Sequence, residues 1–294
     1  MKGPTHATST QPWFAAALLS CLAACTVDAS VHAGCFGLAR RSPDAQEPAK
    51  PEPRPARGWF ARTFDTVVAD HAEFYDTGSM LALGGGLGLA ALSANSQLDR
   101  DIYEDVLPEW RTEEWTEFRD DVLPFGDGAY VLPTLAATAI IAPALGGEAI
   151  GEWGERSLRA ILVGAPPVLA LQRLIGAGRP DDPANTTSSE WEPLRHSNGV
   201  SGHAFIGSIP FLTVASMQDN IVVDGACYLG STLVAGARLQ GSRHYFSQVV
   251  IGWFLGYLAV EAVSDAASIR PDPAVAFVPV LGEDEVGFLV VHRF

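Results

Sequence analysis

The chain has 294 residues, of which 48% are hydrophobic and only 18% are charged, and its formal net charge is −15. Its mean hydropathy of +0.15 makes it richer in apolar residues than a typical soluble enzyme and poorer than a chain composed mostly of membrane spans. The acidic balance argues against nucleic acid as a partner, because phosphate backbones are bound by basic surfaces.

The N-terminus has the layout of an export signal. A polar stretch with one lysine precedes an apolar run from Trp13 to Ala24, about a dozen residues as in secretory signals. The run ends in Leu-Ala-Ala-Cys, which resembles a bacterial lipobox and predicts that residues 1–25 are a signal and that Cys25 is lipidated. Two alternatives are a signal cleaved elsewhere, for instance after Ala33, and a true start codon downstream of the first one.

Residues 26–58 are predicted to form a disordered linker, because most of them lie in a run rich in proline and charge with no apolar period. Of the four cysteines, only Cys35 and Cys227 would remain after removal of the signal and lipidation. Neither a disulfide framework nor a metal site is predicted from them.

The rest of the chain is predicted to be a helical domain over 59–268. Its apolar segments, rich in Ala, Gly and Leu, favour helices over strands and lie at 79–94, 129–145, 158–171, 204–217, 226–237 and 247–263. The expected fold is therefore all-α, a six-helix bundle. The final 269–294 forms a separate tail, whose apolar residues alternate around Gly282-Glu283-Asp284-Glu285 and predict a short β-hairpin from about 274 to 294.

Two connections between these helices are long. Residues 95–128 are acidic and aromatic, which favours an amphipathic packing helix over a cap on a pocket or a segment resting on lipid headgroups. Residues 181–199 are polar and fit either a loop that shapes a substrate site or a solvated connection.

The relation to a membrane is left open by the sequence. Most of the apolar stretches are shorter than the roughly 20 residues that a span needs, and their connections lack a positive-inside bias. If Cys25 is exported and all six stretches span, the third stretch would end in the cytoplasm. The clusters of arginine and histidine described below would then face the cytoplasm as well. We therefore expect a bundle on the extracytoplasmic side, tethered to or lying against a membrane, with true spanning as the alternative.

Three short clusters with arginine and histidine lie where apolar stretches begin or end. The first cluster covers 172–180, the second 200–203 and the third 238–248. Together they contain Arg179, His203, Arg238 and His244 at the ends of predicted helices. This placement predicts one anion-binding pocket.

The clusters resemble the motifs of the phosphatidic acid phosphatase type 2 / haloperoxidase superfamily, which are Lys-x6-Arg-Pro, Pro-Ser-Gly-His and Ser-Arg-x5-His-x3-Asp. The order and all internal spacings agree, and the resemblance spans roughly residues 160 to 260. It implies a helical bundle with its site near the ends of the last four helices. Four positions depart from the motifs, namely Gln172 for Lys, Val200 for Pro, Ala237 for Ser and Gln248 for Asp.

The residue types suit a phosphate group. The planar guanidinium groups of Arg179 and Arg238 can each bind two oxygens. Ser201 and Gly202 precede a long apolar run, so their N–H groups are expected at a helix N-terminus, where an anion is favoured. Gly202 also permits a close approach of the backbone.

Phosphoryl transfer through a covalent intermediate needs a neutral imidazole as nucleophile and a protonated one as acid. The resemblance assigns these roles to His244 and His203. At Gln248 the superfamily's aspartate would stabilise the cation formed on attack, whereas an amide only orients the ring; the analogous change in a serine-protease triad costs about 10⁴ in rate. Gln172 lacks the charge of Lys, and Arg173, displaced by about 100° around a helix, replaces it imperfectly.

The leading hypothesis is a metal-independent phosphatase that acts on a phosphomonoester or pyrophosphate, on a phosphorylated small molecule or lipid, at the bacterial cell envelope. No cofactor is expected. The alternatives are a haloperoxidase with vanadate fixed to His244, which is disfavoured by chain length and by Gln172, and a catalytically impaired phosphate-binding envelope protein, to which Gln172 and Gln248 both point.

Overall fold

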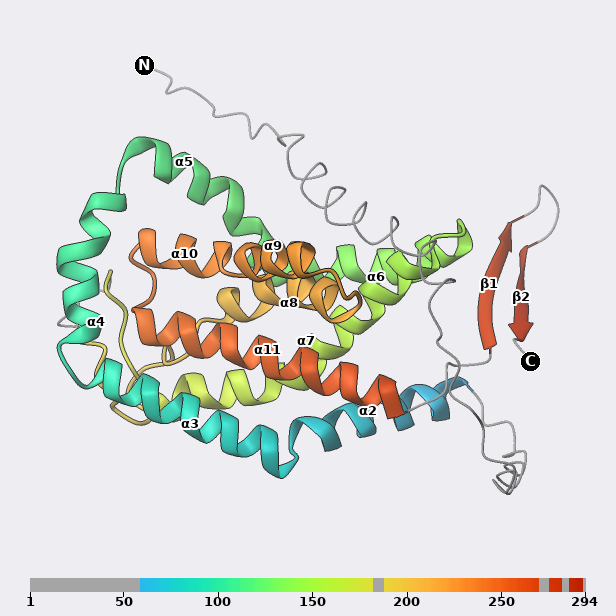
Figure 1. Ribbon diagram of the computed structural model, residues 1–294, viewed down its shortest axis with the longest axis horizontal. Helices are drawn as coiled ribbons and strands as arrows, with labels where there is room; N and C mark the ends of the chain where they lie inside the picture. The colour runs from blue at the N-terminus through green and yellow to red at the C-terminus, as the bar shows by residue number, and fades with distance from the viewer. Residues whose placement is uncertain (1–58, 182–187, 270–274, 282–285, 293–294) are drawn as a thin grey trace, which may run out of the picture.

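The structure is a computed structural model that describes residues 59–181, 188–269, 275–281 and 286–292. The predicted signal, Cys25 and the predicted linker lie outside the described residues. Figure 1 shows a bundle of helices with a separate two-stranded hairpin after the last helix.

The all-α class is confirmed, although the count of six helices is not exact. α2 forms in a segment that was not among the predicted helices, α5 lies in the segment 95–128 for which a packing helix was expected, and the stretch predicted at 226–237 is divided into two helices at Thr232. The elements in chain order are α2 (Trp59–Phe74), α3 (Thr77–Ala94), α4 (Leu98–Asp101), η1 (Ile102–Val106), η2 (Leu107–Trp110), α5 (Glu113–Val122), η3 (Leu123–Gly126), α6 (Gly128–Ala144), α7 (Glu148–Ile175), α8 (Gly202–Ser216), α9 (Ile221–Ser231), α10 (Leu233–Gln240), α11 (Phe246–Ile269), β1 (Val275–Leu281) and β2 (Val286–His292).

The predicted hairpin is present as β1 and β2. The two strands pair antiparallel, with Val275 opposite His292 at one end and Leu281 opposite Val286 at the other. Figure 1 shows the hairpin beyond the end of α11, at the opposite end of the bundle from α4.

α11 packs against α2, α3, α7 and α8, and its crossing with α8 is unusually close. A Cβ atom placed on Gly252 would collide with the carbonyl oxygen of Ser201, and one on Gly256 would collide with the hydroxyl of Ser208. Two glycines four residues apart let helix backbones approach closely. This crossing brings the N-terminus of α11 to the N-terminus of α8.

A buried carboxylate also holds the N-terminus of α11. Asp99 is fully buried and accepts hydrogen bonds from Ser93 Oγ at 2.7 Å, from the Ser247 N–H at 3.0 Å and from Ser247 Oγ at 2.6 Å. It thereby satisfies one of the free N–H groups that every helix start presents. The start of α11 is thus anchored to the end of α3.

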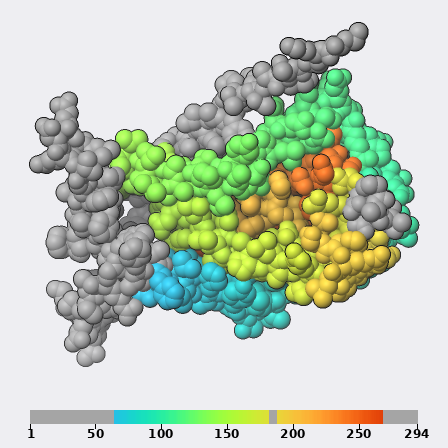
Figure 2. Space-filling view, turned by 180° about the vertical axis from the view of Figure 1, so that it is seen from behind, coloured from blue at the N-terminus to red at the C-terminus, as the bar shows by residue number. Residues whose placement is uncertain are grey.

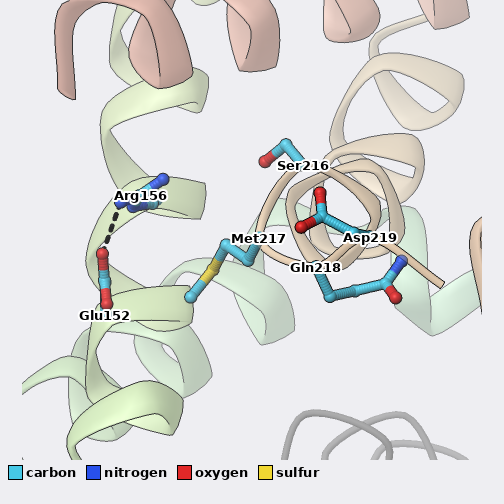
Figure 3. A pocket seen from close by; sticks show the side chains of 6 residues that line it. All are labelled: Glu152, Arg156, Ser216, Met217, Gln218 and Asp219. Atoms are coloured by element: carbon cyan, nitrogen blue, oxygen red, sulfur yellow. Dashed lines mark hydrogen bonds and ion pairs between the residues drawn. The ribbon is translucent and has the colours of Figure 1, made fainter. Parts of the chain in front are cut away.

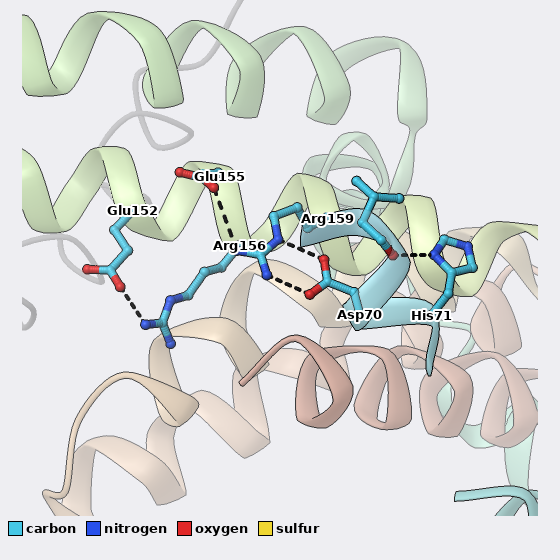
Figure 4. A network of polar contacts seen from close by, with 7 residues as sticks. Asp70, His71, Glu152, Glu155, Arg156 and Arg159 are labelled. Carbon is cyan, nitrogen blue, oxygen red and sulfur yellow. Dashed lines mark hydrogen bonds and ion pairs between the residues drawn. The ribbon is translucent and has the colours of Figure 1, made fainter. Parts of the chain in front are cut away.

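A second buried carboxylate joins α2 to α7. Asp70 is fully buried and receives two hydrogen bonds from Arg159, from Nε at 2.8 Å and from Nη2 at 2.6 Å, while Glu155 lies 3.6 Å from the same guanidinium (Figure 4). Buried charges are tolerated when they are paired and hydrogen-bonded in this way. The network lies in the first half of α7, far along that helix from the first cluster.

Among the described residues, three helices are long and apolar enough to cross a membrane, namely α3, α7 and the Phe246–Ala267 part of α11. α5 to α6 would form a fourth span if counted as one bent segment. The sequence-based lengths were too short for α7 and α11, because both helices continue into polar residues beyond their apolar stretches. Figure 2 shows α6 and α7 on one face. Large apolar side chains on these two helices are exposed, with Ile140 at 66% and Leu169 at 62%. These features support association of the chain with a membrane.

Candidate active site

The first cluster begins on the last turn of α7 and continues into the loop after it. Gly176 ends this helix in the left-handed conformation, with φ of 65°, and a Cβ atom there would collide with the carbonyl of Glu192. Glycine is therefore required at this position. The turn leads the chain through Ala177 and Gly178 to Arg179.

The second cluster forms the N-terminus of α8, as predicted. Ser201 is the N-cap, and its side chain accepts a hydrogen bond from the Ala204 N–H at 3.3 Å. Gln172 of the first cluster donates from Nε2 to the carbonyl of Val200 at 3.1 Å, and a Cβ atom on Gly202 would lie 3.5 Å from the same nitrogen. The amide of Gln172 thus takes the place beside the helix start where the superfamily motif has a lysine.

The spacing between Arg238 and His244 follows from the way α10 ends. The Arg243 N–H donates to the carbonyl of Arg238 and the Ser242 N–H donates to that of Leu239, both at 3.0 Å. Ser242 has a positive φ of 56°, which completes a Schellman-type termination. This closed turn holds Arg238 on the last turn of α10 and delivers His244 directly beyond it.

His244 is buried and its ring is oriented by Gln248. The ring Nδ1 lies 2.9 Å from Oε1 of Gln248, which also accepts the Tyr245 N–H at 3.2 Å, while Nε2 of Gln248 donates to the carbonyl of Gly178 at 2.8 Å. The Tyr245 donor and the Gly178 acceptor together allow only one orientation of the amide. The proton must then lie on Nδ1 of His244, which leaves Nε2 with a free lone pair.

The contact from Gln248 to the Tyr245 N–H is also a helix cap. Residue 248 is the third residue of α11, and a Gln side chain at that position commonly bonds back to the N–H of the residue before the helix. Gln248 therefore has a structural role besides the orientation of His244.

The two arginines and two histidines act on one another electrostatically. Burial, together with Arg238, Arg179 and His203, lowers the pKa of His244 to about 3, although the hydrogen bond to Gln248 raises it. Burial and the neighbouring Arg179 lower the pKa of Arg238 to about 10. Burial, Arg238 and Arg179 lower the pKa of His203. The structure thus brings the residues of all three clusters into one electropositive site.

Both arginines offer a buried N–H group with no acceptor. The Nε atoms of Arg179 and Arg238 are buried and have no hydrogen-bond partner within the described part of the chain. Buried donors are nearly always satisfied in folded proteins, so two orphaned donors on neighbouring cations indicate the place of an anion.

The rim of the site contains a further ion pair. Nη1 of Arg243 lies 2.7 Å from Asp181, which links the chain just after the first cluster to the third cluster. Arg173, by contrast, is exposed, and its carbonyl accepts the Leu194 N–H at 2.8 Å. Arg173 is not among the charged groups that shift the pKa of His203, Arg238 and His244, and its part in phosphate binding stays a prediction.

The segment 188–199 is attached to the bundle beside the site. Ser189 Oγ donates to the carbonyl of Ala94 at 2.7 Å, and the Gly199 N–H donates to that of Gln172 at 3.2 Å. Figure 2 shows the segment against the end of α7. The described part of 181–199 is therefore bonded to the bundle near both of its ends.

The acidic segment 95–128 packs against the same end of the bundle, as expected. Leu107 is 2% exposed and lies in one cluster with Ala204, Ala235 and Val249, which come from α8, α10 and α11. The sequence offered no sign that Asp99 of this segment anchors α11, because a single aspartate in an acidic stretch has no distinguishing pattern.

One hollow of about 280 Å³ lies elsewhere (Figure 3) and is lined by Glu152, Arg156, Ser216, Met217, Gln218 and Asp219. It lies at the far end of α8 from His203, roughly 20 Å away for a helix of this length. Its arginine is already paired with Glu152, so it does not share the electropositive character of the candidate site.

Residues 158–268 match the family model of the PAP2 superfamily. The predicted resemblance is thus confirmed over this segment, which contains all three clusters. The match supports an activity of the phosphatase or haloperoxidase kind. No curated protein and no solved structure matches the chain.

The burial of His244 predicts a pH-dependent stability. Its pKa in the folded protein is about 3, below its ordinary value of about 6.5, so the unfolded chain takes up a proton that the folded protein refuses. The contribution of His244 to the free energy of unfolding is therefore fully present above about pH 6.5, and it is lost as the pH falls towards 3. We expect His244→Asn to show a shallower decline in thermal midpoint between pH 7.5 and 5. Equal slopes in the two proteins would contradict the burial of a neutral imidazole.

Proposed function

We propose that the protein is a metal-independent phosphatase that hydrolyses a phosphomonoester or pyrophosphate through a phosphohistidine on His244. The observation that carries the proposal is the pair of orphaned, buried Nε donors of Arg179 and Arg238 beside a neutral histidine whose Nε2 is free. Together these groups can hold the oxygens of a phosphoryl group and present a nucleophile to its phosphorus atom.

In the first step, Nε2 of His244 would attack phosphorus while the bond to the leaving oxygen breaks. The two guanidinium groups and the N–H groups at the start of α8 would bind the equatorial oxygens, where charge is spread in the transition state. Protonated His203 would give its proton to the leaving oxygen. The products of this step are the free alcohol or phosphate, neutral His203 and phosphorylated His244.

In the second step, water would attack phosphorus and break the N–P bond. Neutral His203 would take the proton from this water, which restores its charge. His244 would return to the neutral form with its proton on Nδ1, held by Oε1 of Gln248 at 2.9 Å. Inorganic phosphate leaves and the enzyme is ready for a further turnover.

The exposed apolar helices favour a substrate at a membrane. α3, α7 and α11 are long and apolar enough to span one, and Leu89 on α3 is 71% exposed. A phosphate on a lipid or isoprenoid carrier would meet the site without leaving the bilayer surface. We propose an extracytoplasmic site at the bacterial envelope, with Cys25 as a lipid anchor.

The proposal is tested by turnover of p-nitrophenyl phosphate by the purified full-length protein in detergent, with chelator and with vanadate in separate arms. We expect turnover that persists with chelator and is inhibited by vanadate, which mimics the pentavalent transition state. A base-stable, acid-labile phosphoryl group on residue 244, identified by mass spectrometry, would identify the intermediate.

The same assay separates the alternatives. Halide oxidation by peroxide in the presence of vanadate, with no phosphate release, would support a haloperoxidase. Binding of phosphate with no turnover of either kind would support an impaired protein, the outcome to which Gln248 points, since an amide supplies no charge to the imidazole cation. Loss of activity with chelator would contradict the metal-independent mechanism.

A further inference from the structure

The loop before α6 lies directly on the first turn of α8. Gly126 is buried, and a Cβ atom placed on it would come within 2.7 Å of the carbonyl oxygen of His203 and within 2.5 Å of Val234 Cγ1. No side chain fits between this loop and α8. The backbone at residue 126 is therefore fixed against the histidine to which the role of acid is assigned.

Asp127 follows this contact and is held in one conformation. Its backbone is extended, with φ of −86° and ψ of 115°, and its Oδ1 accepts the Ala129 N–H at 2.9 Å as the N-cap of α6. The residue is half-buried. Its carboxylate is bonded to the start of α6, and its backbone follows directly on the residue that lies against the carbonyl oxygen of His203, so the residue is held beside the first turn of α8.

The other groups close to His203 are two cations and a neutral imidazole. Arg238 faces it from α10, Arg179 from the loop after α7, and His244 from the connection between α10 and α11. Burial, Arg238 and Arg179 all lower the pKa of His203, and Asp127 is the group that raises it. An acid in such a pocket would lose its proton unless a negative charge opposed the arginines.

We propose that Asp127 is a positioning residue for His203, whose carboxylate keeps that imidazole protonated so that it can give a proton to the leaving oxygen. The inference rests on the proposed function and adds a residue outside the three clusters and outside the matched segment 158–268. A bound dianionic phosphoryl group would also help to keep His203 protonated. Before the substrate binds and after phosphate leaves, Asp127 alone would keep it protonated.

The test uses Asp127→Asn, because asparagine is as good an N-cap as aspartate and removes only the charge. Titration of the histidine ring Cε1–H signals by NMR, with His203 assigned through His203→Gln, measures the effect without turnover. We expect the pKa of His203 to fall by about one unit, which is a tenfold change in its proton affinity. The basic limb of the kcat profile should move to lower pH, with turnover at pH 8 reduced about tenfold.

Two variants separate charge from structure. Asp121→Asn removes an exposed carboxylate of α5 and should leave both the titration and the pH profile unchanged. Asp127→Ala removes the cap as well as the charge, and should add a fall in the thermal midpoint to the same pH shift.

An unchanged titration of His203 in Asp127→Asn would overturn the inference, whatever the activity. A shifted titration in a protein that turns over no phosphate ester would support the charge pairing and would count against the proposed function alone. A loss of stability in Asp127→Asn with an unshifted pH profile would show that the residue serves only as a helix cap.

Discussion

Replacement of His244 by alanine should reduce phosphate-ester turnover by about four orders of magnitude or more, because no other group can form the covalent intermediate and only binding and electrostatic stabilisation would remain. The anion site itself should survive. Arg179, Arg238 and the start of α8 are held by elements that do not depend on the imidazole, so His244→Ala should still bind inorganic phosphate or vanadate. The measurements are kcat for p-nitrophenyl phosphate and the Kd for vanadate from calorimetry.

A matched control is available in His71→Ala. The ring of His71 lies 2.9 Å from the carbonyl of Val67 within α2, and Figure 4 shows it in the network around Asp70 and Arg159. This variant should retain turnover. Full activity of His244→Ala would contradict the phosphohistidine mechanism, and loss of vanadate binding together with turnover would show that the imidazole helps to form the anion site.

Replacement of Gln248 by aspartate should raise turnover. When His244 attacks phosphorus its imidazole becomes cationic, and a buried carboxylate beside Nδ1 would stabilise that cation where an amide cannot. We expect a gain of about 10- to 1,000-fold in kcat, below the 10⁴ penalty of the reverse change in a serine-protease triad, because the remaining dipoles suit an amide. The shorter side chain would give up the hydrogen bond to Gly178, at a cost of about 1 kcal/mol in stability.

Gln248→Glu is the informative comparison. It has the length of glutamine, so one oxygen would keep the place of Oε1 near His244, and the other would take the place of Nε2, which lies 2.8 Å from the carbonyl oxygen of Gly178. Only a protonated carboxyl could donate there, and that form carries no charge. We therefore expect this variant to remain near the parent rate. If neither Gln248→Asp nor Gln248→Glu exceeds the parent while His244→Ala is inert, the missing charge does not limit turnover.

The helical class and the positions of the clusters could be predicted because they depend on local chemistry. Apolar segments rich in alanine and leucine form helices wherever they pack, and Gly176, Ser201 and Gly202 mark helix ends through their own backbone preferences. The spacing of Arg238 and His244 is equally local, since one turn after α10 determines it. Motifs of this kind could be recognised in the sequence without knowledge of the fold.

The lengths of the helices could not be predicted as well. α7 extends over 28 residues and α11 over 24, beyond their apolar stretches, because polar residues continue both helices. In α7 these residues include Glu152 and Arg156, which form an ion pair one turn apart. Inside the predicted stretch, the charge of Arg159 is compensated by Asp70, which is 89 residues away along the chain and cannot be found in a sequence window around α7. The argument from short apolar stretches against spanning therefore fails for these two helices.

By itself the sequence determined that the chain is helical, that two arginines and two histidines lie at helix ends, and that Gln172 and Gln248 replace charged residues of the superfamily motif. Only the tertiary structure decided which orientation the Gln248 amide adopts, that Asp99 anchors the start of α11, and that Gly126 lies against His203. The reason is that each of these outcomes depends on contacts between segments far apart in the chain. Gly252 and Gly256 bring α11 onto α8, Gly178 supplies the acceptor for the amide, and Gly126 presses the start of α6 against His203.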